Sequence, residues 1–229
     1  VYTAKYGYFR GFKLVGRMPW FQRDHVDRKS RLEMEFLEGL DLAGKVAYDI
    51  GSSIGPHTFL FRRLMGDSGH IYCFEPEPGA FATLERLIAL NELRNITPFP
   101  IGLGDVSGTF RMTIPDSSRV AMAGTLNAEL QGALTPNQIT GTISVDVHRL
   151  DDWHSRQHMR DPDFIKIDVE GFEQNVLIGG RNLLRRTRPT LFIEIHGATT
   201  EAKASNGSGV MTILSEFGYA FRHFESGKD

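Results

Sequence analysis

Short apolar runs alternate with amphipathic stretches along most of the chain from residue 45 onward. Apolar runs bounded by polar turns are typical of buried strands, and apolar positions three and four residues apart are typical of helices. Strands are predicted at 45–50, 70–74, 96–100, 164–168, 190–196 and 219–224. Helices are predicted at 56–65, 81–91, 173–184 and 210–217. This alternation predicts an α/β fold, with a mostly parallel, twisted sheet covered by helices on both faces.

Residues 106–150 interrupt the alternation. The segments 108–114 and 141–147 each alternate apolar and polar positions, which predicts an antiparallel pair of strands. Between them, 115–136 is rich in Ser, Thr, Gly and Asn. Long irregular insertions in compact domains are usually functional or disordered. We therefore predict a flap here that contributes to substrate binding.

Residues 1–44 precede the first predicted strand and form a separate extension to the domain of 45–229. A helix is predicted over 24–40, with Leu32, Phe36 and Leu40 on one face, and we expect this helix to pack against the domain. The aromatic stretch before it contains Tyr8 and Trp20. This stretch has two interpretations. It either forms a lid or wall of the substrate site, or it packs against the domain.

The composition of the chain limits which kinds of molecule the protein is expected to bind. The chain has 229 residues and a formal net charge of −2, so charge alone gives no sign of a nucleic-acid surface. The single cysteine, Cys73, excludes an internal disulfide. No apolar run approaches the length of a membrane span, and residue 1 does not open a signal peptide. We expect a cytoplasmic protein, and the oligomeric state cannot be deduced from these features.

The segment 46–55 carries the most informative pattern. An apolar strand runs into Asp49, and glycines follow at Gly51 and Gly55. Glycines allow the backbone to approach a ligand closely because they lack a Cβ atom. Glu75 follows the next strand, where a nucleotide-binding sheet places a carboxylate for ribose hydroxyls. The pattern predicts an adenosine-containing cofactor, although a tight strand-to-helix turn without a ligand would show the same glycines.

Asp49 distinguishes between two such cofactors. The dinucleotide fingerprint G-x-G-x-x-G brings a helix N-terminus to a pyrophosphate, and here Asp49 stands where its first glycine would be. A carboxylate would repel the pyrophosphate, whereas it would attract the amino group and sulfonium of S-adenosylmethionine. We therefore predict S-adenosylmethionine rather than a dinucleotide.

The segment 164–173 is the second dense motif. Asp168 closes a predicted strand at its carboxyl end, where ligands of open α/β sheets bind, so a functional role is favoured for it. Glu170 and Glu173 begin the next helix. Carboxylates in a first helical turn are stabilised by the helix dipole, and this structural role is favoured for Glu173.

The following strand ends in Glu194 and His196, which share a face because alternate strand residues do. If the two strands are neighbours, Lys166 pairs with Glu194 one layer down, because a buried lysine needs a partner. Asp168 and His196 then lie at the cleft. A neutral histidine can take a proton from a hydroxyl group, although His196 would equally well anchor the loop that follows.

With both motifs in place, the chain resembles the FkbM-type S-adenosylmethionine-dependent methyltransferases. The matching pieces cover residues 45–197 in order: 49–55 with Thr58, 74–78, 90–91, 102–105, 166–173, and 188–189 leading into 194–196. The family usually has Ala-Asn between the motif glycines, where this chain has Ser52 and Ser53. Serine retains the ability to form hydrogen bonds. The resemblance is poorest in 1–40 and 106–150, where we expect substrate choice to be determined.

The resemblance implies a Rossmann-like class I methyltransferase fold with a terminal antiparallel strand. It also implies O-methylation of a hydroxyl on a sugar or natural-product acceptor. Its implied cofactor contacts are Asp49, Gly51, Ser53, Gly55 and Thr58 at the methionine end, Glu75 and Pro76 at the ribose, Gly104 and Asp105 at the adenine, and Asp168 near the transferring methyl.

A sugar hydroxyl is a poor nucleophile, so a general base is expected. His196 and Asp168 are the leading candidates, followed by Glu170. A divalent metal on Asp168, Glu194 or His196 is a second route, which is not favoured because the spacing shows no dedicated cage. An N-methyltransferase, a non-catalytic cofactor-binding module and a nucleotide-dependent oxidoreductase remain as alternatives.

Overall fold

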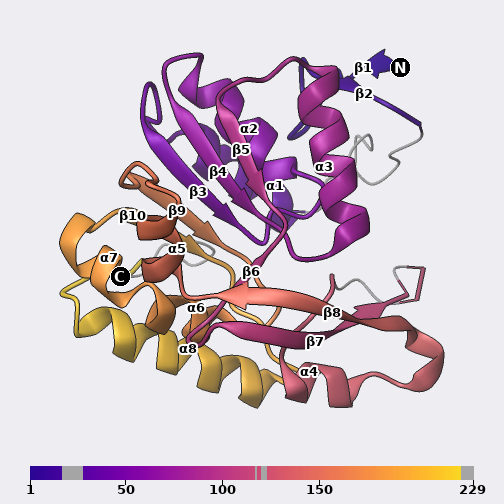
Figure 1. The fold of residues 1–229 in the computed structure, drawn as a ribbon, viewed down its shortest axis with the longest axis vertical. Helices are drawn as coiled ribbons and strands as arrows, with labels where there is room; N and C mark the ends of the chain where they lie inside the picture. Colours follow the sequence, from indigo (N-terminus) through magenta and orange to yellow (C-terminus); the bar gives the residue numbers. More distant parts are fainter. Residues whose placement is uncertain (17–27, 117, 120–122, 223–229) are drawn as a thin grey trace.

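A computed structural model of the protein describes residues 1–16, 28–116, 118–119 and 123–222. Five parallel strands form the main sheet in the order β10-β9-β3-β4-β5 (Figure 1). They are β3 Val46–Ile50, β4 His70–Phe74, β5 Ile96–Phe99, β9 Phe164–Ile167 and β10 Thr190–Ile193. The strand order reverses direction between β3 and β9. Open α/β sheets bind ligands beyond the carboxyl ends of the strands at such a point.

Helices cover both faces of this sheet. One face carries α1 Arg28–Glu38, α2 Pro56–Met65 and α3 Pro78–Leu90, and the other carries α5 Leu150–Arg156, α6 Glu173–Gly179, α7 Arg181–Thr187 and α8 Thr200–Ser215. Successive residues of a strand point to opposite faces. Ala47 accordingly joins the first hydrophobic cluster and Tyr48 the second. The predicted α/β fold class is confirmed.

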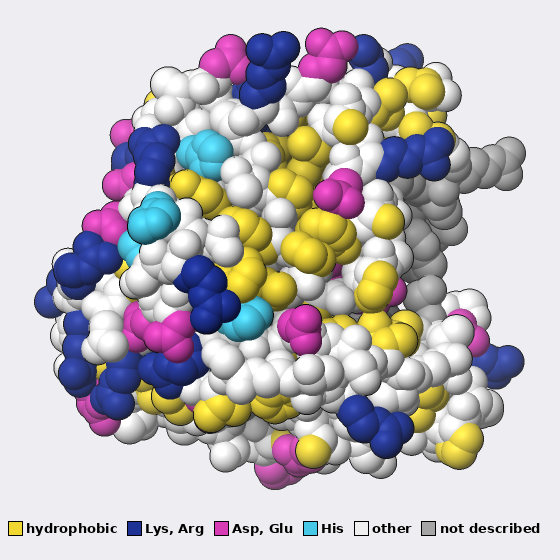
Figure 2. Space-filling model, viewed as in Figure 1, with side chains coloured by type: hydrophobic (Ala, Val, Ile, Leu, Met, Phe, Trp, Pro, Cys, Tyr) yellow, Lys and Arg dark blue, Asp and Glu magenta, His cyan; other side chains and the backbone are white. Residues whose placement is uncertain are grey.

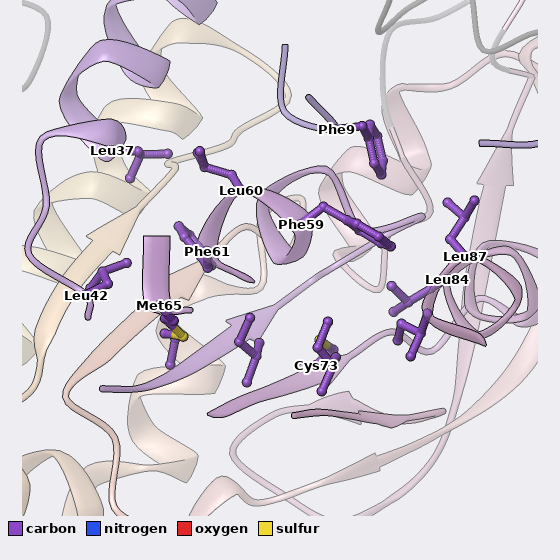
Figure 3. Packing of buried hydrophobic residues seen from close by; sticks show 14 of the residues in the cluster. Phe9, Leu37, Leu42, Phe59, Leu60, Phe61, Met65, Cys73, Leu84 and Leu87 are labelled. Atoms are coloured by element: carbon purple, nitrogen blue, oxygen red, sulfur yellow. The ribbon is translucent and has the colours of Figure 1, made fainter. Parts of the chain in front are cut away.

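The N-terminal extension packs onto the α2 face. Phe9, Leu37 and Leu42 are buried in the same cluster as Phe59 and Leu60 of α2 (Figure 3). The predicted packing helix is confirmed as α1 and buries Leu37, but Phe36 of its predicted apolar face is 38% exposed. Residues 17–27, including Trp20, lie outside the described residues. The short strands β1 Tyr2–Thr3 and β2 Lys13–Leu14 form a hairpin beside this cluster. The boundary at residue 44 stays a prediction.

The insertion forms a second sheet. β7 Gly108–Pro115 and β8 Ile139–His148 pair antiparallel as predicted, and β6 Gly102–Leu103 adds to β8 in parallel. The pair extends to one side of the molecule below the main sheet (Figure 1). Between the strands lie the short helices α4 Ala128–Ala133 and η2 Pro136–Gln138. The segment 115–136 is therefore less irregular than its composition predicts.

Three predictions near the C-terminus are wrong in part. The helix expected over 173–184 is two helices, α6 and α7, separated at Gly180. A side chain at Gly179 would meet the carbonyl of Gly104, so this junction needs small residues. The last helix, α8, begins at Thr200 rather than 210, since the side chain of Thr199 caps it by accepting from the Ala202 N–H.

The third correction concerns the final strand expected over 219–224. Residues 219–222 form no strand, and 223–224 lie outside the described residues. The N–H of Tyr219 instead bonds back to the carbonyl of Leu214, which extends the C-terminal turn of α8. Among the strands of the described residues, antiparallel pairing is found in β1–β2 and β7–β8. Within the described ranges, no helix is both long and apolar enough to cross a membrane.

Candidate active site

The glycine-rich turn after β3 is shaped by neighbouring backbone. Gly51 has φ +77°, and a Cβ there would lie 1.8 Å from the carbonyl oxygen of Asp168. Gly55 has φ +96° and precedes α2. Both conformations favour glycine. The close approach that the motif predicted is thus made, at Gly51, to the loop after β9, and this contact brings the ends of β3 and β9 together.

Asp49 lies beneath this turn, fully buried. Its Oδ2 accepts a hydrogen bond of 2.6 Å from the Thr58 hydroxyl, and its Oδ1 lies 3.7 Å from Nζ of Lys166. Burial alone would lower the pKa of Lys166, but the carboxylates of Asp168 and Asp49 outweigh burial, and its pKa lies above the usual value. Glu194, the partner expected from the sequence, adds to this increase. Asp49 and Thr58 therefore hold the turn from below.

Glu75 follows β4 and faces a cavity of about 280 Å³. Its two carboxylate oxygens accept the backbone N–H groups of Ser53, at 2.7 Å, and Glu77, at 2.8 Å. Burial raises the pKa of Glu75 to about 7 despite these two hydrogen bonds. The carboxylate is fixed in place and retains acceptor capacity toward the cavity.

The cavity lies beyond the carboxyl ends of β3, β4 and β9. Six of the predicted site residues line it, namely Gly51, Ser53, Glu75, Pro76, Asp168 and Glu170. The sequence did not identify its apolar wall, which includes Ile101, Leu103, Met112, Ile114, Leu126 and Phe172. Met112 and Ile114 are two residues apart in β7, so the sequence predicts that they share a face of the strand. It does not predict that this face borders the cavity. Hydrophobic side chains gather between the main sheet and β7–β8 on the face shown in Figure 2.

Gly104 and Asp105 are placed differently. They are not among the described residues that line the cavity, whereas Ile101, Gly102 and Leu103 just before them are. The Asp105 side chain accepts a hydrogen bond of 2.9 Å from Asn175 of α6. Their predicted contact with adenine stays a prediction.

Acidic side chains and one histidine converge at the end of the cavity next to β9 and β10. Nε2 of His196 lies 3.7 Å from Asp168, 3.8 Å from Glu170 and 4.0 Å from Glu194. Its Nδ1 bonds to the buried Glu173 over 2.9 Å. The sequence predicted Asp168 and His196 together at this edge, with Glu194 one layer down beside Lys166. Glu194 also lies at the edge, because β10 ends at Ile193 and both Glu194 and His196 follow the strand. Glu173 also accepts the Gly171 N–H, so it combines the expected role at the helix start with a contact to His196.

Neighbouring charges shift the pKa values of His196 and Asp168 against the effect of burial. Burial alone would lower the pKa of His196, but its bond to Glu173 and the charges of Glu170 and Asp168 raise it to about 9. In the free protein His196 is therefore an imidazolium at neutral pH, which differs from the neutral histidine of the sequence interpretation. Burial would raise the pKa of Asp168, yet Lys166 and His196 hold it below its usual value.

Glu170 occupies a strained turn at the cavity wall. Its φ is +47°, a conformation that is uncommon outside glycine. Its side chain accepts the Ala123 N–H over 3.0 Å, and its carbonyl accepts the Thr125 hydroxyl over 2.7 Å. Burial raises the pKa of Glu170. Strain of this kind persists where the surroundings enforce it and often marks functional sites.

These features fit S-adenosylmethionine. The apolar wall at Ile101 and Leu103 suits an adenine ring, and the adjacent Glu75 suits the ribose diol. At the other end, Asp168 and Glu170 suit the positive sulfonium. Gly51 and Ser53 of the glycine turn line the part of the cavity that the methionine portion would occupy. When bound there, S-adenosylmethionine would supply an electrophilic methyl group beside the histidine–carboxylate cluster.

Comparison with known proteins agrees with this class of site. The family model described as the methyltransferase FkbM domain matches residues 49–221. The chain is 28% identical over 165 residues to the 2-O-methyltransferase NoeI of Sinorhizobium fredii, covering 69% of this chain and 66% of that protein. It is 29% identical over 153 residues to the hexuronic acid methyltransferase AglP of Haloferax volcanii, covering 66% of this chain and 56% of that one.

The chain belongs to the FkbM methyltransferase domain family. It spans about two thirds of the length of NoeI and just over half that of AglP. A solved structure of a proposed rRNA methylase from Clostridium thermocellum superposes with a TM-score of 0.51 at 9% identity, covering 83% of this chain and 80% of that one. This last likeness concerns the fold alone.

Proposed function

We propose that this chain transfers the methyl group of S-adenosylmethionine to a hydroxyl group of a saccharide or related natural-product acceptor. The observation that carries the proposal is the placement of His196, Asp168 and Glu170 beside a cavity that also holds Glu75. One part of the site suits the nucleoside, and the adjoining part offers proton acceptors. A saccharide acceptor is consistent with the names of the relatives NoeI and AglP.

Methyl transfer is an in-line displacement, so the acceptor oxygen must lie on the side of the methyl group opposite the sulfur. The oxygen–carbon bond forms as the sulfur–carbon bond breaks, and the bonding electron pair stays on the sulfur of S-adenosylhomocysteine. The hydroxyl proton passes to a carboxylate or histidine of the cluster. We assign this role to Glu170 because the turn at 170–171 holds its carboxylate at the cavity wall, with Asp168 and His196 orienting the hydroxyl.

Two alternatives predict a different use of the cluster. A nitrogen acceptor needs less help from a base, so an N-methyltransferase would tolerate the loss of His196. A non-catalytic module would bind the cofactor without turnover. The cytoplasmic location and the absence of a nucleic-acid partner stay predictions from the sequence.

The test is a transfer assay with S-adenosylmethionine that carries a ¹³C-labelled methyl group. The acceptors are a panel of neutral methyl glycosides, uronic acid glycosides and amino sugars. We expect a labelled O-methyl product by mass spectrometry, with its position given by NMR correlation to a ring carbon. Label found only on nitrogen would overturn the assignment to a hydroxyl. Cofactor binding without transfer to any member of the panel would favour the binding module.

A further inference from the structure

His196 is held in one orientation by a carboxylate that solvent does not reach. Its Nδ1 bonds to Oε1 of the fully buried Glu173 over 2.9 Å. The other oxygen of Glu173 accepts from Asn206 over 2.6 Å, which fixes the carboxylate in turn. The opposite ring nitrogen, Nε2, therefore points away from Glu173. Metal-ligating histidines are usually oriented in this way, by a carboxylate on the nitrogen that does not touch the ion.

The distances around Nε2 of His196 are too long for hydrogen bonds. Asp168 Oδ1 lies at 3.7 Å and Glu194 Oε1 at 4.0 Å, whereas a direct N–H···O bond measures about 2.7–3.2 Å. Two atoms that ligate one ion at about 2.1 Å lie about 3 Å apart when adjacent and about 4 Å apart when opposite. Ligand atoms of Asp168, Glu194 and His196 all lie within 4.8 Å of one another. One small cation between them would therefore need only small side-chain movements.

The two oxygens of Asp168 are used differently. Oδ2 is 3.0 Å from Nζ of Lys166, which orients the carboxylate and leaves Oδ1 facing His196. The charges of the surrounding cluster are also unequal. Five carboxylates share this region with Lys166 and His196, the carboxylates being Asp49, Asp168, Glu170, Glu173 and Glu194. When Nε2 of His196 ligates an ion, it releases the proton that it carries in the free protein, which leaves Lys166 as the cation among these seven side chains. Such a cluster favours an additional cation, because buried negative charge is costly without one.

We propose that Asp168, Glu194 and His196 bind a divalent cation of the Mn²⁺ type, with coordination positions left open for acceptor hydroxyls. Two carboxylate oxygens and one imidazole nitrogen suit such an ion, and Mg²⁺ would bind less tightly to the same set. This inference rests on the proposed function, since the ion would act on the acceptor oxygen. A hydroxyl that reaches the ion has its pKa lowered, so its proton leaves more easily to Glu170 as the oxygen–methyl bond forms.

Mn²⁺ itself is the probe. Chelator-treated protein is titrated with MnCl₂ in the presence of S-adenosylhomocysteine, and free Mn²⁺ is followed by its EPR signal. We expect one bound ion per chain. Glu194→Gln and His196→Gln should each weaken Mn²⁺ binding at least about tenfold, and Glu173→Gln should weaken it about 10–100-fold by releasing the histidine ring. Glu85→Gln is the matched control, because it removes an exposed carboxylate of α3 outside the cluster.

A second readout places the ion at the acceptor. Bound Mn²⁺ should broaden the NMR lines of the glycoside that is methylated in the transfer assay, and Glu194→Gln should abolish this broadening. The inference is overturned if the wild-type protein binds no Mn²⁺, or if Glu194→Gln and Glu85→Gln bind it equally well. Calorimetry with S-adenosylhomocysteine on the same samples confirms that each variant is folded. Cofactor binding and methyl transfer without Mn²⁺ binding would reject the metal site and leave the proposed function intact.

Discussion

Asp49 and Lys166 face each other across the junction of β3 and β9, where their Cα atoms are register partners and their side chains approach to 3.7 Å. Asp49 belongs to the glycine-rich motif and Lys166 to the motif that ends in Asp168. Lys166 also lies 3.0 Å from Asp168, so one buried ammonium joins the two motifs. The contact ties the floor of the cofactor cavity to the histidine–carboxylate cluster.

Replacing Lys166 with methionine should strongly destabilise the fold. The methionine preserves much of the volume but leaves Asp49 and the inner oxygen of Asp168 without their cation. Loss of one partner from a buried ion pair costs about 3–5 kcal/mol. Urea denaturation measures the change in the free energy of unfolding, with Lys203→Met on the exposed face of α8 as the control. A difference between the two variants below about 0.5 kcal/mol would contradict this role.

Gly51→Ala should damage both folding and cofactor binding. The added Cβ would lie 1.8 Å from the carbonyl oxygen of Asp168, and the φ of +77° is unfavourable for alanine. We expect a loss of more than about 2 kcal/mol in the free energy of unfolding. Gly132→Ala in α4, where nothing lies within 4 Å, should instead be neutral or stabilising by about 0.5–1 kcal/mol. Comparable stability of the two variants would refute the steric argument.

Glu75 makes stability depend on pH. Its pKa is about 7 in the folded protein, above its usual 4.5, so the folded state holds the proton more tightly than the unfolded state. This contribution is complete below about pH 4.5 and is lost as pH rises through 7. Glu75→Gln removes it, so the free energy of unfolding of the variant should gain about 3 kcal/mol relative to wild type between pH 4.5 and 8. Urea denaturation across this range measures it, and a constant difference would show that Glu75 is not perturbed.

His196→Ala separates oxygen from nitrogen acceptors. If the acceptor is a hydroxyl, loss of this side chain should lower kcat by about 10²-fold or more, because His196 orients the hydroxyl for proton transfer to Glu170. The affinity for S-adenosylhomocysteine should change little, since the ring lies beyond the described lining of the cofactor cavity. Steady-state kinetics and calorimetry on one preparation give both values. An unchanged kcat would favour a nitrogen acceptor.

Much of the parallel sheet could be predicted from the sequence because its strands are short apolar runs between turn residues. The proximity of Asp168 and His196 followed from one rule, that the carboxyl ends of neighbouring parallel strands share an edge. The position of Glu194 beside them did not, because the sequence placed it one layer down with Lys166. The bond from Glu173 to His196 could not be predicted in this way. It depends on the depth at which α6 is buried and on Asn206 of α8, and the sequence pattern places α8 too late.

The residues that form the apolar wall of the cavity could not be predicted from the sequence either. The alternating pattern of β7 predicts that Met112 and Ile114 share a face, but only the packing of β7–β8 against the main sheet shows that they border the cofactor cavity. The pairing of Asp49 with Lys166 depends on strand register, which an apolar run does not determine. Gly51 has the positive φ and the close backbone approach that the motif predicts, but the approach is to the carbonyl oxygen of Asp168. Its contact with the cofactor stays a prediction.

The measurement that tests the central claim most directly is calorimetric titration with S-adenosylmethionine and S-adenosylhomocysteine, with Glu75→Ala alongside. The account predicts that the wild-type protein binds both ligands at one site per chain. The variant should bind each at least about tenfold more weakly, because the ribose loses a charge-assisted hydrogen bond. Failure of the well-folded wild-type protein to bind either ligand would contradict the assignment of this cavity to the cofactor.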